Sequence, residues 1–132
     1  MLPHSLLDTH VLVRWRIEAR KLSREQLRVL EAAALRREPL GVSAIGLLEI
    51  AVLTSEGRLK LPLEEFFDEL QANPVFRILP LNCEIASEIA SLGNSLRDPA
   101  DRAIVATARV HRLRLVTSDQ RIIQSKLVAT VG

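Results

Sequence analysis

Short apolar segments alternate with longer amphipathic segments along the chain, and this alternation constrains the fold more than any other feature. The apolar segments have the length and the boundaries of β-strands, and they lie at 5–8, 39–43, 75–80, 113–119 and 126–130. The amphipathic segments have apolar residues at helical spacing, and they lie at about 9–16, 24–37, 44–54, 63–72, 83–92 and 99–111. Strands that alternate with helices predict an α/β fold with a central, mostly parallel sheet and right-handed connections.

Length and composition limit the class of protein. A chain of 132 residues is expected to form a single domain over 1–132. With 48% hydrophobic and 26% charged residues, it is expected to be globular. The longest segment without a charged residue, 39–48, has ten residues, whereas a membrane-spanning helix needs about 20, so we expect no membrane segment. No basic region precedes the first apolar run, which predicts no signal peptide and a cytoplasmic protein.

Three residue types narrow the chemistry. Cys83 is the only cysteine, which excludes an internal disulfide and a cysteine-based zinc site; we expect it to be half-buried and inert. His4, His10 and His111 have no paired ligand spacing. The net charge is only +2, but 15 of the 18 basic residues are arginine, which suits bidentate phosphate contacts. Genomic base composition explains the same bias equally well. With three Phe, one Trp and no Tyr, a base-stacking platform is not expected.

Two aspartates directly follow predicted strands. Asp8 ends the segment 5–8, and Asp119 ends the segment 113–119. Ligands of open α/β sheets bind outside the carboxyl ends of the strands, so these two side chains are placed to converge on one site. The alternative is that each aspartate opens a turn or caps a helix, which aspartate does well.

Glu49 lies on the apolar side of its predicted helix. It comes four residues after Ile45, three before Val52 and four before Leu53. A carboxylate that faces the core is costly without a partner, which makes Glu49 a candidate site residue. A place at the rim of the core, or a salt bridge to an arginine, is the alternative.

The segment RDPADRAIVATA, 97–108, contains two aspartates with different expected roles. Asp98 precedes Pro99 at the first position of the predicted helix, so it is expected to be the N-cap. Asp101 begins the buried stripe instead, because Ile104 and Val105 follow it at +3 and +4. An acid in the first turn also complements the helix dipole, but that does not explain why it heads the apolar face.

Together these acids indicate a metal-dependent reaction. Four or five carboxylates would meet at one end of a parallel sheet, with no lysine or histidine beside them, and such a cluster needs a cation to stay ionised. Ligands that are all oxygen suit Mg²⁺ or Mn²⁺. Divalent ions held by carboxylates activate water for in-line displacement at a phosphodiester. No nucleophile triad and no glycine-rich phosphate loop suggests other chemistry.

Four segments carry a family resemblance when taken in order and at their observed spacings. They are LLDTHVLVRW (6–15), VSAIGLLEIAVLTSEGRLKL (42–61), LRDPADRAIVATARV (96–110) and LRLVTSD (113–119). The chain resembles the PIN-domain ribonucleases, and specifically the VapC toxins of bacterial and archaeal toxin–antitoxin pairs, over about residues 5–130. By this resemblance the metal-binding and catalytic residues are Asp8, Glu49, Asp101 and Asp119. The possible accessory residues are Asp98, Thr9, Thr117 and Ser118.

The resemblance also implies a fold, a cofactor and partners. The expected fold is a PIN-like three-layer α/β/α sandwich. The expected activity is Mg²⁺-dependent (or Mn²⁺-dependent) endoribonuclease cleavage, with Arg14, Arg97 and Arg102 as candidate contacts to the RNA backbone. A homodimer and a separate antitoxin that blocks the site are expected as well. Two alternatives stay open: a PIN nuclease without a toxin role that acts in RNA processing or on DNA, and a catalytically silent interaction module.

Overall fold

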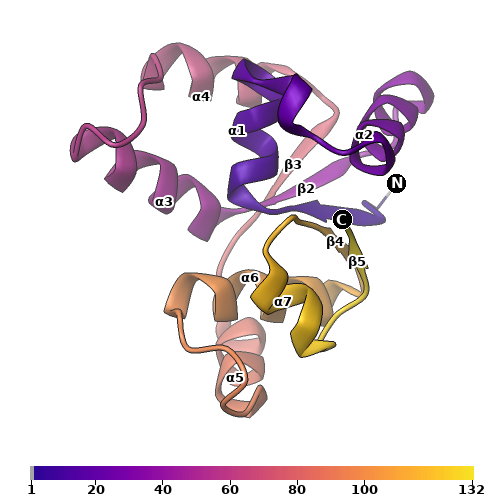
Figure 1. Cartoon of the computed structure of the whole chain (residues 1–132), viewed down its shortest axis with the longest axis vertical. Coiled ribbons are helices and arrows are strands. Elements are labelled where there is room, and N and C mark those ends of the chain that lie inside the picture. The colour runs from indigo at the N-terminus through magenta and orange to yellow at the C-terminus, as the bar shows by residue number, and fades with distance from the viewer. Residues whose placement is uncertain (1) are drawn as a thin grey trace.

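The central element is a five-stranded sheet in which every pair of neighbours is parallel (Figure 1). We analysed a computed structural model, which describes residues 2–132. The strand order is β3-β2-β1-β4-β5, and the strands are β1 (Ser5–Leu7), β2 (Leu40–Ser43), β3 (Phe76–Leu79), β4 (Arg114–Val116) and β5 (Thr130–Val131). The first strand in sequence is thus the middle strand of the sheet, between β2 and β4. This arrangement confirms the predicted α/β class and the parallel sheet.

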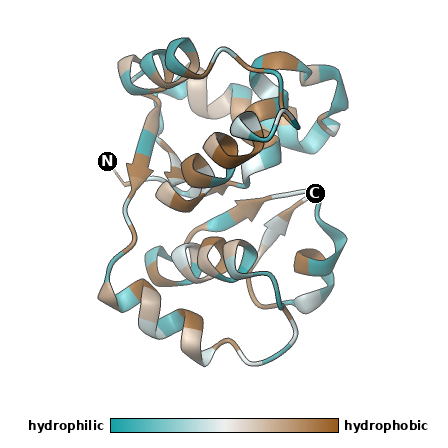
Figure 2. Cartoon of the chain, turned by 90° about the vertical axis from the view of Figure 1, so that its left-hand side faces the viewer, coloured by the Kyte–Doolittle hydropathy of each residue, from teal (hydrophilic) through white to brown (hydrophobic). Residues whose placement is uncertain are grey.

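Helices cover both faces of the sheet, which gives the three layers that were predicted (Figure 1). One layer contains α1 (Thr9–Ile17), the 3₁₀ helix η1 (Ala19–Lys21), α2 (Arg24–Arg36), α3 (Ala44–Ser55) and α4 (Leu63–Ala72). The other contains α5 (Cys83–Ser91), α6 (Pro99–His111) and α7 (Gln120–Ser125). In Figure 2 most helices change between brown and teal along their length. That pattern is expected of helices that bury one side only.

The pleat of β1 divides the core into two parts. Leu7 and Val42 face the layer of α1 to α4, where Leu12 and Ile50 are among the buried residues. Leu6 faces the opposite layer, where the core includes residues of α5, α6 and α7. Because successive side chains of a strand point to opposite faces, two neighbouring residues of β1 contribute to the two cores.

Several helix boundaries follow from local signals that the sequence displays. Ser23 and Gln26 form the reciprocal capping box that begins α2. Ser43 and Asn82 cap α3 and α5 through hydrogen bonds to the backbone N–H groups of the first turn. These caps confirm the predicted starts.

Four features of the structure differ from the predictions. The C-terminal strand is Thr130–Val131 and not 126–130. The helix α7, which was not predicted, precedes this strand. It forms because Asp119 caps it and Ile122 packs into the core. The short helix η1 was not predicted either. Cys83 is exposed rather than half-buried, since it is the first residue of α5, on the turn whose apolar contact is made by Ile85.

No helix in the described part of the chain is long and apolar enough to cross a membrane.

A matched pair of leucines on α2 tests the assignment of its buried face. Leu30 is completely buried, whereas Leu35 is 86% exposed. Leu30→Ala is expected to lower the free energy of unfolding by about 2–5 kcal/mol, because it removes packed methyl groups and leaves a cavity. Leu35→Ala on the same helix is expected to change it by less than about 0.5 kcal/mol. Urea unfolding followed by circular dichroism measures both, and equal effects would contradict the assigned orientation of α2.

Candidate active site

Four of the predicted acids line one pocket at the carboxyl edge of the sheet. Asp8 follows β1, Asp119 follows β4, Glu49 lies in the middle of α3, and Asp101 lies in the first turn of α6. The pocket has a volume of about 450 Å³. Strands β1 and β4 are neighbours, so their carboxyl ends bring Asp8 and Asp119 to the same edge. The helices α3 and α6 contact each other and bring the other two acids to this edge.

Asp8 is the most buried of these acids, with 4% of its surface exposed. One carboxylate oxygen, Oδ1, accepts a hydrogen bond from the backbone N–H of Thr9 (2.8 Å). The other, Oδ2, accepts from the hydroxyl of Thr117 (2.7 Å). The first bond makes Asp8 the N-cap of α1, which was the alternative role predicted from the sequence. The second bond joins Asp8 to the end of β4. Asp8 therefore both caps a helix and faces the pocket.

The turn that follows β4 positions Asp119. The Thr117 hydroxyl, which donates to Asp8, also accepts from the backbone N–H of Asp119 (3.0 Å). Oδ1 of Asp119 accepts from the backbone N–H of Arg121 (2.9 Å), so Asp119 caps α7. Thr117 is completely buried, and its single hydroxyl connects two of the four acids.

Glu49 is held from the opposite side of the pocket by Thr9. The Thr9 hydroxyl donates to Oε1 of Glu49 at 2.6 Å. Burial raises the pKa of the Glu49 carboxyl; the Thr9 hydrogen bond lowers it, and the charges of Asp8 and Asp98 raise it. Close approach here depends on Gly46, because a Cβ at that position would lie 3.1 Å from the Thr9 hydroxyl oxygen.

Asp101 has neither a hydrogen bond nor an ion pair to its carboxylate among the described residues, in contrast to the other three acids. Burial raises the pKa of Asp101 to about 6, and the charges of Asp98, Asp119, Asp8 and Glu49 raise it in the same direction. The sequence placed this residue at the head of the buried stripe, and the structure agrees, because the helix behind it is buried from Ala103 to Ala108. Asp101 is thus where the negative charge of the site is least compensated.

The donor set suits a hard divalent cation. All four acids offer carboxylate oxygens to one pocket, and their mutual repulsion is the electrostatic condition that a cation relieves. In the described part of the chain, however, no three or more His, Cys, Asp or Glu side chains form a ready-made metal site. Several carboxylate oxygens are engaged by neighbouring hydroxyl and N–H groups in this structure.

The accessory residues differ in what they contact. Asp98 is the N-cap of α6 and accepts from the backbone N–H of Asp101 (3.0 Å), as predicted. Arg14 lines the acid pocket. Arg97 is exposed and directly precedes Asp98 in the sequence. The guanidinium of Arg102 donates to the backbone carbonyls of Ile89, Gly93 and Leu96. These three bonds give Arg102 a structural part in holding the α5–α6 connection.

The expectation that no lysine or histidine lies beside the acids was wrong. Lys21 lines the pocket, where it pairs with Glu18 (3.1 Å). His10 lies with Nδ1 3.5 Å from Oδ2 of Asp8, and its Nε2 accepts from the backbone N–H of Ser118 (3.0 Å). Burial lowers the pKa of the His10 imidazole, against the charge of Asp8, which raises it. His10 has no paired metal-ligand spacing, so it was not among the predicted site residues. Its position two residues after Asp8 is the signal that would have identified it.

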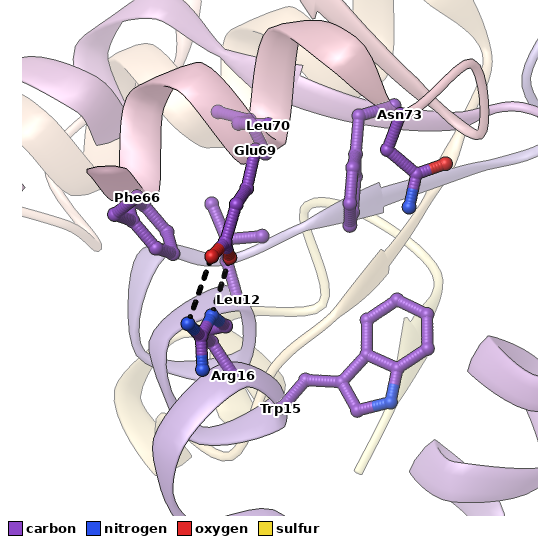
Figure 3. A pocket seen from close by; sticks show the side chains of 8 residues that line it. Leu12, Trp15, Arg16, Phe66, Glu69, Leu70 and Asn73 are labelled. Carbon is purple, nitrogen blue, oxygen red and sulfur yellow. Dashed lines mark hydrogen bonds and ion pairs between the residues drawn. The ribbon is translucent and has the colours of Figure 1, made fainter. Parts of the chain in front are cut away.

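A second cavity, of about 230 Å³, lies between α1, α4 and β3 (Figure 3). Its lining is mainly apolar and includes Leu12, Trp15, Phe66 and Phe76. Trp15 and Phe76 make an edge-to-face contact with ring centroids 5.9 Å apart. The only charged groups at this cavity, Arg16 and Glu69, bind each other through two hydrogen bonds, at 2.7 and 3.0 Å. The cavity is therefore mainly apolar, and its charged lining residues are paired with each other.

Comparison with known proteins assigns the family. The model of the PIN domain family matches residues 5–126. The chain belongs to the PIN domain family, which confirms the resemblance seen in its four motif segments. Among curated proteins it is similar to "Ribonuclease VapC22" of Mycobacterium tuberculosis, with 35% identity over 120 residues that cover 89% of this chain and 88% of the relative.

Solved structures support the same fold. VapBC2 from Rickettsia felis, bound to a DNA fragment from its promoter, contains a chain that matches with a TM-score of 0.74 and 16% identity, over 96% of each chain. FitAcB from Neisseria gonorrhoeae matches with a TM-score of 0.71 and 24% identity, over 97% of this chain and 96% of that one. At these identities the likeness establishes the PIN-like architecture.

Replacing Asp101 by Asn is expected to stabilise the metal-free protein at alkaline pH. Because the pKa rises on folding from 3.8 to about 6, the folded state binds this proton more tightly, and stability is lost as the pH rises through that interval. With chelator present, Asp101→Asn should therefore raise the free energy of unfolding at pH 8 by about 1–2 kcal/mol, allowing for solvent screening. Below pH 3.8 the gain should vanish.

Urea unfolding at the two pH values measures the effect. Asp68→Asn, which removes a carboxylate from the exposed side of α4, is the matched control and should change little at either pH. If Asp101→Asn were no more stable than the unmodified chain at pH 8, the result would contradict the inference that burial and nearby charges destabilise the ionised Asp101 carboxylate.

Proposed function

We propose that this chain is a metal-dependent endoribonuclease toxin of the VapC type, which a cognate antitoxin neutralises. The observation that carries the proposal is the convergence of Asp8, Glu49, Asp101 and Asp119 on one pocket from four different elements. Membership of the PIN family and the relation to Ribonuclease VapC22 support it. The reaction is hydrolysis of an RNA phosphodiester bond.

In this proposal the four carboxylates hold Mg²⁺ or Mn²⁺ at the edge of the sheet. When bound, the ion lowers the pKa of water to yield the nucleophile and stabilises the charge that develops on the phosphate. The residues of the chain set the geometry. Thr117 fixes Asp8 relative to Asp119, and Thr9 fixes Glu49 relative to the start of α1.

The RNA backbone is proposed to lie along the basic side of the pocket. Arg14 lines the pocket itself, and Arg97 is exposed one residue before Asp98. Contacts of this kind bind phosphates and orient the strand without reading its sequence. Arg102 is proposed to contribute through the α5–α6 connection that its three hydrogen bonds hold, next to Arg97. The homodimer that the resemblance implies stays a prediction.

Loss of either of two pocket acids is expected to abolish cleavage. Asp8→Asn and Asp101→Asn remove negative charge that the proposed ion requires. Mg²⁺-dependent cleavage of RNA should therefore fall by more than about 100-fold, which is the largest loss typical of residues that only orient metal ligands. Cleavage of a labelled RNA pool by the purified full chain, with and without chelator, measures this. Asp68→Asn should keep the activity of the unmodified chain, and circular dichroism verifies that all variants fold.

The outcomes separate the three candidate functions. Undiminished cleavage in both pocket variants would overturn the site assignment. No cleavage by the unmodified chain in Mg²⁺ or Mn²⁺ would favour the interaction module. Cleavage without growth arrest on expression in cells would favour a PIN nuclease that acts in RNA processing. Mapping the 5′ ends of the fragments would identify the RNA that is cut.

Asp98 is expected to act mainly as a cap. Serine caps helices about as well as aspartate, so Asp98→Ser should keep most of the cleavage activity. Asp98→Ala should lose about 1 kcal/mol of stability because the backbone N–H of Asp101 loses its acceptor. Both variants are tested by the same RNA assay and by urea unfolding. Complete loss of activity in a folded Asp98→Ser variant would instead place Asp98 among the residues that contact the ion.

A further inference from the structure

Two neutral side chains from distant parts of the chain hold the turn between β4 and α7, and the function proposed above uses neither of them. Ser118 is the central residue of this turn, between Thr117 and Asp119. Its backbone N–H donates to Nε2 of His10 at 3.0 Å, and its hydroxyl accepts from Nε2 of Gln26 at 2.9 Å. Ser118 thereby connects the start of α1, the start of α2 and the end of β4.

Gln26 is completely buried, and both ends of its amide are used. Its oxygen accepts from the backbone N–H of Ser23 at 3.0 Å, which is the second half of the capping box, while its nitrogen donates to Ser118. Capping explains the first bond but not the second, whose partner lies 92 residues away in the sequence. A buried amide with both ends bound has one orientation, so it acts as a rigid connection between the start of α2 and the turn.

His10 makes the corresponding connection to Asp8. Because Nε2 accepts a hydrogen bond, it carries no proton, and the proton of the neutral ring is on Nδ1. Nδ1 lies 3.5 Å from Oδ2 of Asp8. One imidazole ring therefore lies between the buried carboxylate at the end of β1 and the backbone of Ser118.

We propose that His10 and Gln26 are positioning residues that act through Ser118. They fix the Thr117–Asp119 turn so that the Asp119 carboxylate faces Asp8 across the pocket. The inference rests on the proposed function, since the divalent cation is the ligand whose binding depends on this placement. It adds two residues that are not among the four acids, and a contact from α2, a helix that supplies no acid to the pocket.

Two amide side chains of different length at position 10 test the contact with Ser118. The amide of Gln reaches the place of Nε2, so its oxygen accepts from the Ser118 N–H, whereas the shorter Asn reaches only the place of Nδ1. Titration of the full-length chain with MnCl₂ by calorimetry, without RNA, measures the result. His10→Asn is expected to weaken Mn²⁺ binding about 10- to 100-fold, the range for residues that orient metal ligands, and His10→Gln should restore binding close to that of the unmodified chain.

A second pair separates positioning from capping. Gln26→Met removes both the capping bond and the contact with Ser118, whereas Ser23→Ala removes the Ser23 hydroxyl from the cap and leaves Gln26 free to bind Ser118. Both variants should melt at lower temperature, but only Gln26→Met should weaken Mn²⁺ binding, again about 10- to 100-fold. If Gln26→Met does not fold, the pair at position 10 decides alone.

The outcomes distinguish this inference from the function on which it rests. Mn²⁺ affinity that is unchanged in His10→Asn would overturn the positioning role, as would equal weakening in His10→Asn and His10→Gln. An unmodified chain that binds no Mn²⁺ would overturn the proposed function, and this inference with it. If the unmodified chain binds Mn²⁺, Asp8→Asn binds it more weakly and the pattern expected at position 10 is seen, the result supports both the proposed function and the positioning role.

Discussion

The hydrogen bond from the Thr117 hydroxyl to the buried Asp8 carboxylate is the contact on which the rest of the site depends. It joins the carboxyl ends of β1 and β4, the two neighbouring strands that each deliver an acid. The same hydroxyl accepts from the backbone N–H of Asp119, so a single side chain contacts the carboxylate of one acid and the backbone of the other. The parallel sheet makes this possible, because only strands that run in one direction present their carboxyl ends at a shared edge.

Much of this arrangement could be predicted from sequence because its causes are local. Strand and helix periodicity predicted the α/β class and the parallel sheet, and the position of Pro99 predicted that Asp98 is a cap. The three layers were implied by the family resemblance. What the sequence did not reveal depends on contacts between distant segments. Gln26 forms half of the capping box of α2, which is a local signal, but its second bond reaches Ser118, 92 residues away in the sequence. The helix α7 was missed because its six residues are too few to show a period, and its start depends on the cap by Asp119.

The folded chain tolerates an electrostatic cost at this edge. Burial and the charges of four other acids raise the pKa of Asp101, whose carboxylate has no hydrogen bond among the described residues, so its ionised form destabilises the fold. An apolar or amide side chain there would give a more stable fold. Sites that bind charge commonly retain such unfavourable groups, since the stability that they sacrifice is recovered when the ligand binds.

The groups that hold the acids are mostly neutral, and this explains how the site keeps its charge. Asp8 and Glu49 accept from threonine hydroxyls and a backbone N–H, while a neutral imidazole and an amide hold the turn that carries Asp119. The nearest guanidinium to Asp119, that of Arg121, is 3.8 Å away and 81% exposed, so it screens little. A cationic donor at the same distance would instead offset the charge of the carboxylates. Neutral donors separate the two tasks: the protein supplies the geometry, and the negative charge remains for a bound cation to balance.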